Sequence, residues 1–81
     1  MQKKNISLGQ SIKDHLQKFF EMHGSTEPSS GLYEDIINEV EKALIIETLH
    51  YVGNIQSKAA KILGINRNTL RKKIQEHNII C

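Results

Sequence analysis

Apolar residues recur at helical spacing along this 81-residue chain, and no stretch alternates apolar and polar residues for long enough to form a β-strand. The pattern begins near the N-terminus, with apolar positions at Leu8, Ile12, Leu16, Phe19 and Phe20. It predicts an amphipathic helix over residues 10–23, preceded by a flexible N-terminal segment, residues 1–9. We therefore predict an all-α fold of four helices, with the whole chain forming a single domain.

A second, longer helix follows a loop over residues 24–31, where Pro28 prevents a continuous helix. We expect it to begin at Ser30 or Gly31 and to end near Tyr51. Its apolar positions share one broad face and comprise Leu32, Tyr33, Ile36, Ile37, Val40, Ala43 and Leu44. Towards its end the opposite side is apolar too, through Ile45, Ile46 and Leu49.

A helix that is apolar almost all round is buried on several sides, which a single chain of this length can hardly achieve. Cys81 is the only cysteine, so disulfide bonds cannot supplement a core that supplies only about 3–5 kcal/mol. We therefore predict a homodimer in which residues 10–53 form the dimerisation helices. Glu39 and Glu41 are expected to form a solvated stripe on the second helix.

Two short helices close the chain, and their spacing is that of a helix-turn-helix. The first is predicted over Gln56–Leu63, and Asn66 is expected to cap the second, which runs to about His77. Gly64 stands where the chain reverses and a positive φ is needed, and Ala60 is small where the helices approach. The predicted core positions of this unit are Leu63, Ile65, Leu70 and Ile74. Residues 54–81 are thus the predicted DNA-binding region.

The charge is divided unevenly along the chain. Residues 1–53 contain five Lys against eight Asp and Glu, a net charge of −3, whereas residues 54–81 contain six Lys and Arg against Glu76 alone, a net charge of +5. This asymmetry predicts that the C-terminal third meets an anionic partner, with a merely solvated basic face as the alternative.

Double-stranded DNA suits this basic face. Because Leu70 and Ile74 turn inward, the last helix presents its polar residues outward, and such a helix fits the major groove with its N-terminus at the base edges. Arg67 is the candidate to pair with guanine O6 and N7, with Asn66 beside it. The candidate contacts to the sugar–phosphate backbone of the DNA are Gln56, Ser57, Lys58, Thr69, Arg71, Lys72 and Lys73.

The segments Gln56-Ser-Lys-Ala-Ala and Leu63-Gly-Ile-Asn-Arg-Asn-Thr-Leu-Arg-Lys-Lys-Ile74 resemble the C-terminal signature of the Fis family, the bacterial factors for inversion stimulation. The same signature ends the NtrC-type activators that work with sigma-54. The resemblance covers about residues 10–80. It implies an intertwined homodimer that bends DNA with loose sequence preference and acts as a nucleoid-associated transcription regulator. It also implies that Asn66 and Arg67 read bases, and that the backbone contacts fall on Ser57, Lys58, Thr69, Arg71, Lys72 and Lys73.

The chain departs from the Fis pattern at two places. In Fis an Asn directly precedes the Gln of the first motif helix, whereas here Ile55 stands there and Asn54 lies one place earlier. We expect Asn54 to cap the helix instead. Fis also carries a β-hairpin arm that activates an invertase, and the short segment before the first helix predicts that this arm and this activity are missing.

The sequence contains no pattern typical of an enzyme, a cofactor site, a metal site, a small-molecule substrate site or a membrane segment. We therefore predict a non-enzymatic, cytoplasmic protein of the bacterial nucleoid. DNA and a second copy are the predicted partners, and RNA polymerase is a further candidate. Two other hypotheses stay open. The chain is the isolated DNA-binding domain of an NtrC-type sigma-54 activator, or it is a helical dimer whose basic face binds an acidic protein.

Overall fold

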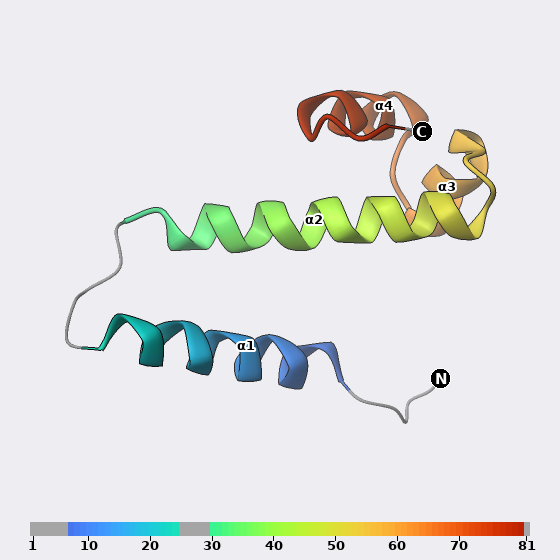
Figure 1. The fold of residues 1–81 in the computed structure, drawn as a ribbon. Helices are drawn as coiled ribbons and strands as arrows, with labels where there is room; N and C mark the ends of the chain where they lie inside the picture. Colours follow the sequence, from blue (N-terminus) through green and yellow to red (C-terminus); the bar gives the residue numbers. More distant parts are fainter. Residues whose placement is uncertain (1–6, 25–29, 81) are drawn as a thin grey trace. The chain divides into compact units, whose positions relative to one another are not determined.

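The computed structural model describes residues 7–24 and 30–80, and over these residues the chain forms α-helices and no strand (Figure 1). The helices are α1 (Leu8–His23), α2 (Leu32–Tyr51), α3 (Gln56–Leu63) and α4 (Arg67–Glu76). This confirms the predicted all-α fold of four helices. Most of the predicted flexible segment, and Cys81, lie outside the described residues. None of the described helices is long and apolar enough to cross a bilayer.

Helix α1 belongs to a first compact unit, which extends to Leu32. It begins at Leu8 rather than Gln10 because the side chain of Ser7 accepts a hydrogen bond from the backbone N–H of Gln10 at 3.0 Å. This bond satisfies one of the free amides of the first helical turn, so the helix starts earlier than the apolar pattern indicates. Within the single chain no residue of α1 is buried.

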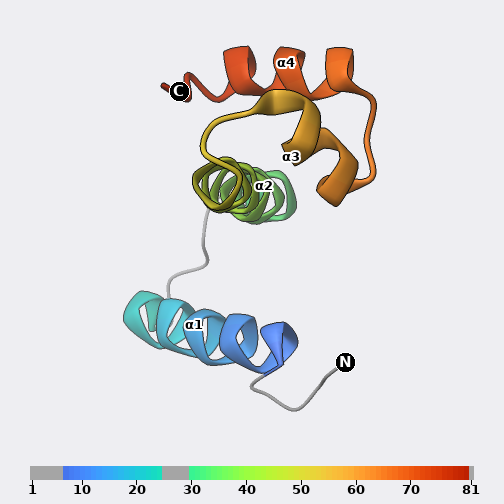
Figure 2. The ribbon, with the colours of Figure 1, turned by 90° about the vertical axis from the view of Figure 1, so that its right-hand side faces the viewer.

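The second unit begins at Tyr33 and contains one core to which α2, α3 and α4 all contribute. Each helix contributes two buried apolar side chains to it, and together they are Ile45, Leu49, Ala59, Ala60, Leu70 and Ile74. Figure 2 looks nearly along α2 and shows α3 and α4 on one side of it. The predicted core positions are confirmed, since Leu63 and Ile65 also pack against this cluster. Ala59, which is fully buried, adds a second small side chain at the close approach of the helices.

The reversal between α3 and α4 is a Schellman turn. The backbone N–H of Ile65 donates to the carbonyl of Ala60 at 3.1 Å, and that of Gly64 donates to the carbonyl of Lys61 at 3.2 Å. Gly64 has φ 76° and ψ 29°, the left-handed conformation expected there. The turn brings Ile65 onto the core, and α4 begins two residues later in a new direction.

Several apolar side chains of α2 remain exposed in the single chain. Leu44 is 54% exposed, Ile37 48% and Tyr33 78%. These positions belong to the broad apolar face predicted for the helix, whereas its C-terminal part is covered by α3 and α4 through Ile45 and Leu49. Within the described second unit, α3, α4 and the residue that ends α4 therefore contact α2 from Glu41 onward.

Candidate nucleic-acid interface

The start of α4 is fixed by Asn66, as predicted. Its backbone is extended (φ −66°, ψ 144°), and its Oδ1 accepts a hydrogen bond from the backbone N–H of Asn68 at 2.7 Å. This bond caps the helix and leaves the Nδ2 of Asn66 with hydrogens to donate. Arg67 is the first residue of the helix and is exposed. Its guanidinium is therefore presented from a rigid helix end.

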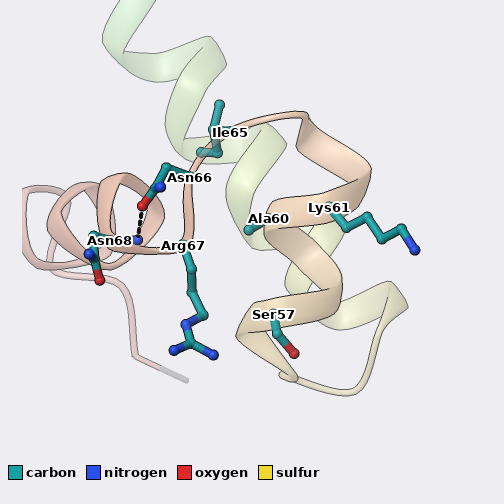
Figure 3. Close-up of a pocket in the computed structure, with 7 residues that line it drawn as sticks. All are labelled: Ser57, Ala60, Lys61, Ile65, Asn66, Arg67 and Asn68. Carbon is teal, nitrogen blue, oxygen red and sulfur yellow. Dashed lines mark hydrogen bonds between the residues drawn. The ribbon is translucent and has the colours of Figure 1, made fainter.

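A shallow open hollow lies between α3 and the start of α4, lined by Ser57, Ala60, Lys61, Ile65, Asn66, Arg67 and Asn68 (Figure 3). The side chains of Ser57 and Arg67 extend from their two helices toward the same side. Three of the predicted contact residues, Ser57, Asn66 and Arg67, are thereby brought together. Lys61, which the sequence analysis did not include, also lines the hollow, and its place four residues after Ser57 on α3 was the available signal.

The first turn of α3 has no side-chain cap. The expectation that Asn54 caps it is wrong, because Asn54 takes part in ending α2. Its backbone N–H donates to the carbonyl of Leu49 at 2.8 Å. Its φ is 66°, so it continues the left-handed turn that begins at Gly53. The backbone amides of Gln56 and Ser57 have no partner among the residues that the structure describes. The partial positive charge of this helix end is therefore open to an anion.

The outward face of α4 carries the polar side chains predicted for it. Leu70 and Ile74 are buried at 0% and 7% exposure, which turns the remaining residues outward. Exposed along the helix are Asn68, Thr69, Arg71, Lys72 and Gln75. On α3, Ser57 and Lys58 are exposed as well, while Gln56 is half-buried. Most of the predicted contact residues thus lie on open surface of the α3–turn–α4 unit.

Lys73 lies apart from this outward face. Its Nζ is 2.8 Å from Oε2 of Glu41 on α2, and Oε1 of the same carboxylate is 2.8 Å from Nε2 of His77. Hydrogen bonds from Lys73 and then His77 hold the pKa of Glu41 below its ordinary value, and the bond to Glu41 raises the pKa of Lys73. The interpretation of Glu41 as part of a solvated stripe is therefore wrong. Sequence pattern could not reveal this contact, because its partners lie far apart along the chain.

Comparison with known proteins places this arrangement in a family. Residues 36–77 match the sequence profile described as bacterial regulatory protein, Fis family. The chain is 40% identical over 73 residues to a putative Fis-like DNA-binding protein of Neisseria meningitidis serogroup A, covering 90% of this chain and 91% of that protein. It is 36% identical over 76 residues to the DNA-binding protein Fis of Actinobacillus succinogenes, covering 93% and 75%.

A second group of relatives is much longer than this chain. The DNA-binding transcriptional regulator NtrC of Rhizobium meliloti is 42% identical over 72 residues, which cover 89% of this chain but only 15% of that protein. The resemblance predicted from the sequence is thus confirmed, both to Fis-like proteins of similar length and to NtrC. The chain belongs to the Fis family of bacterial regulatory proteins, and its α3–turn–α4 unit is the family's helix-turn-helix.

Proposed function

We propose that this protein is a non-enzymatic transcription regulator of the bacterial nucleoid that binds and bends double-stranded DNA as a homodimer. The observation that carries the proposal is the exposed guanidinium of Arg67 at the capped start of α4, beside a row of exposed basic and polar residues. A helix that presents its N-terminal end and a basic outer face in this way suits the major groove. The Fis-like relatives are named as DNA-binding proteins, which supports DNA as the ligand.

The proposed contacts are of two kinds, those that read DNA bases and those that bind the phosphates of the DNA backbone. Arg67 reads a guanine through O6 and N7, and Asn66, whose Oδ1 is taken by the cap, adds a donor from Nδ2. The free amides at the start of α3, where Ile55 stands in place of the Asn of the Fis pattern, bind a phosphate. The phosphate-contacting side chains in this proposal are Gln56, Ser57, Lys58, Thr69, Arg71 and Lys72. Loose sequence preference follows, because most of these contacts carry no base information.

The proposal of a homodimer is supported by the apolar side chains that are exposed in the single chain. Ile37 and Leu44 on α2 are about half exposed, and Phe20 on α1 is 46% exposed. A second copy would cover these side chains and place two helix-turn-helix units on one side of a duplex. The same dimer would be available to contact RNA polymerase when it is bound beside a promoter.

The decisive test is binding of the wild type and Arg67→Ala to a set of fluorescent duplexes across a salt series, measured by anisotropy. Wild type should prefer some duplexes, and Arg67→Ala should lose about 1–3 kcal/mol of that discrimination. Lys42→Ala changes an exposed Lys on α2, outside the α3–turn–α4 unit, and this matched control should bind as wild type does. Equal weakening on every duplex by Arg67→Ala would contradict its role in base readout. Absence of binding at moderate salt would favour a protein partner.

A second candidate is the DNA-binding domain of an NtrC-type activator, favoured by the 42% identity to NtrC of Rhizobium meliloti. Both candidates bind DNA, so binding assays do not separate them. An immunoblot of the native protein does, because a band near 9.2 kDa supports a stand-alone regulator. A band several times larger supports the activator.

A further inference from the structure

The two neighbouring lysines near the end of α4 lie in different surroundings. Lys72 is exposed with Arg71 on the outward side, whereas Lys73 is half-buried on the side of Ile74 and contacts α2. The side chains of Lys73 and Glu41 are 31% and 29% exposed, and that of His77 only 12%. Lys73 therefore shares a side of the helix with its buried residues rather than with its solvated ones.

Glu41 engages one of its oxygens with α4 and the other with His77, the residue that caps the end of α4. Oε2 meets the ammonium of Lys73 and Oε1 meets Nε2 of His77, each at 2.8 Å. A carboxylate only accepts hydrogen bonds, so Nε2 of His77 donates in this contact. The two partners stand four residues apart, one turn of helix, and the single carboxylate therefore spans the last turn of α4.

This polar cluster supplies what the apolar core does not. Leu70 and Ile74 hold α4 against α2 and α3, but apolar contacts have little directional preference. Hydrogen bonds to a charged group at 2.8 Å are directional, and they fix how α4 is rotated and how far it slides along α2. The rotation of α4 determines where Arg71 and Lys72 point.

We propose that Glu41 positions α4, with Lys73 and His77 as its two anchors, and that the charge of Lys73 serves this contact instead of a DNA phosphate. The inference rests on the proposed DNA-binding function. It makes Glu41, an acidic residue on the dimerisation helix, a determinant of DNA affinity without any contact to DNA. It also separates the two adjacent lysines, Lys72 for the phosphate backbone and Lys73 for the internal anchor.

The salt dependence of binding distinguishes these roles. Lys72→Ala should flatten the plot of log affinity against log salt by about one unit, as loss of one phosphate contact does. Lys73→Ala should leave the slope unchanged and weaken binding about two- to fivefold on every duplex, the size expected from a lost partly exposed ion pair. Glu41→Gln should weaken binding to the same extent with the same slope.

A charge exchange tests positioning against a merely structural effect. Lys73→Glu alone should weaken binding strongly, because it sets two carboxylates against each other. The double variant Glu41→Lys with Lys73→Glu restores the pair in reverse, and the introduced carboxylate can still meet His77 one turn later on the same helix. We expect the double variant to recover affinity to within about threefold of wild type, as additivity fails for residues in contact. Circular dichroism spectra of all variants should match the wild type.

Three results would overturn the inference. One is a slope that Lys73→Ala flattens as much as Lys72→Ala does. Another is a Glu41→Gln variant that binds DNA more tightly and with a steeper dependence of log affinity on log salt. That result would mean that Glu41 keeps Lys73 from contacting DNA. The third is a charge-exchange variant that binds no better than Lys73→Glu. If the wild type itself binds no duplex, the proposed function falls, which is a different and separately recognisable result.

Discussion

Replacement of Gly64 tests how much the reversal between α3 and α4 depends on backbone conformation alone. Gly64 has φ 76°, and a Cβ built there would meet no atom within 4 Å. Gly64→Ala therefore creates no clash, and its cost is that of holding an L-residue in the left-handed region, about 1–2 kcal/mol. For a domain of this size that corresponds to a fall in Tm of about 4–8 °C for each kcal/mol.

The chain provides its own control for this substitution. Asn78 occupies the equivalent left-handed position after α4, at φ 56°. The same pair of bonds closes that turn, from the backbone N–H of Ile79 to the carbonyl of Ile74 at 3.0 Å and from the backbone N–H of Asn78 to the carbonyl of Gln75 at 3.1 Å. Gly64→Asn should therefore cost clearly less than Gly64→Ala, since Asn tolerates this conformation better than other residues.

The assay is thermal unfolding followed by circular dichroism, with every variant at the same protein concentration because the Tm of the proposed dimer would depend on that concentration. Salt-dependent DNA binding of the folded variants should keep the wild-type slope, since no phosphate contact is altered. An alanine variant as stable as the wild type, or an asparagine variant less stable than the alanine one, would refute the argument from backbone conformation.

Three further substitutions probe the core, the ion cluster and the dimer. Leu70→Ala removes a side chain with 0% exposure and should cost about 2–5 kcal/mol in urea unfolding, whereas a loss below about 1 kcal/mol would contradict its place in the core. For Glu41 the pKa lies below its ordinary value of 4.5, so its stabilising effect is present above pH 4.5 and lost as pH falls through the lowered pKa. The stability difference between wild type and Glu41→Gln should therefore vanish in acid, and a difference that persists there would count against the ion cluster. Leu44→Glu replaces a side chain that is 54% exposed in one chain, so a monomer should tolerate it within about 0.5 kcal/mol. In the proposed dimer it should cause dissociation or unfolding, seen by sedimentation, and an intact dimer would contradict the proposed interface.

Local sequence signals predicted the helix-turn-helix well. The bounds of α3 and the cap at Asn66 follow from apolar spacing and from residues whose preference acts within one turn. The start of α1 is equally local, since Ser7 followed by Gln10 is a capping pattern, but apolar spacing alone points to a later start. At Asn54 two local preferences compete, helix capping and the left-handed conformation, and the chain after Gly53 adopts the second.

The role of Glu41 could not be predicted in this way. Its partners are Lys73 on α4 and His77 at the end of α4, and their contact depends on how α4 packs across α2. Periodicity assigns residues to the inside or outside of one helix, and an acidic residue beside an apolar stripe is usually solvated. Only the tertiary arrangement shows that this carboxylate has two partners, and that Lys73 differs from Lys72.

The core shared by α2, α3 and α4 also affects how the protein opens. Because Leu49, Ala60 and Leu70 belong to one buried cluster, α4 cannot leave its place without uncovering the end of α2. The helix-turn-helix and that helix end should thus exchange their backbone amide hydrogens as one cooperative unit, with similar protection at Leu49 and Leu70. A ligand bound to the outer face of α4 would slow exchange at Leu49, which lies on the other side of the core.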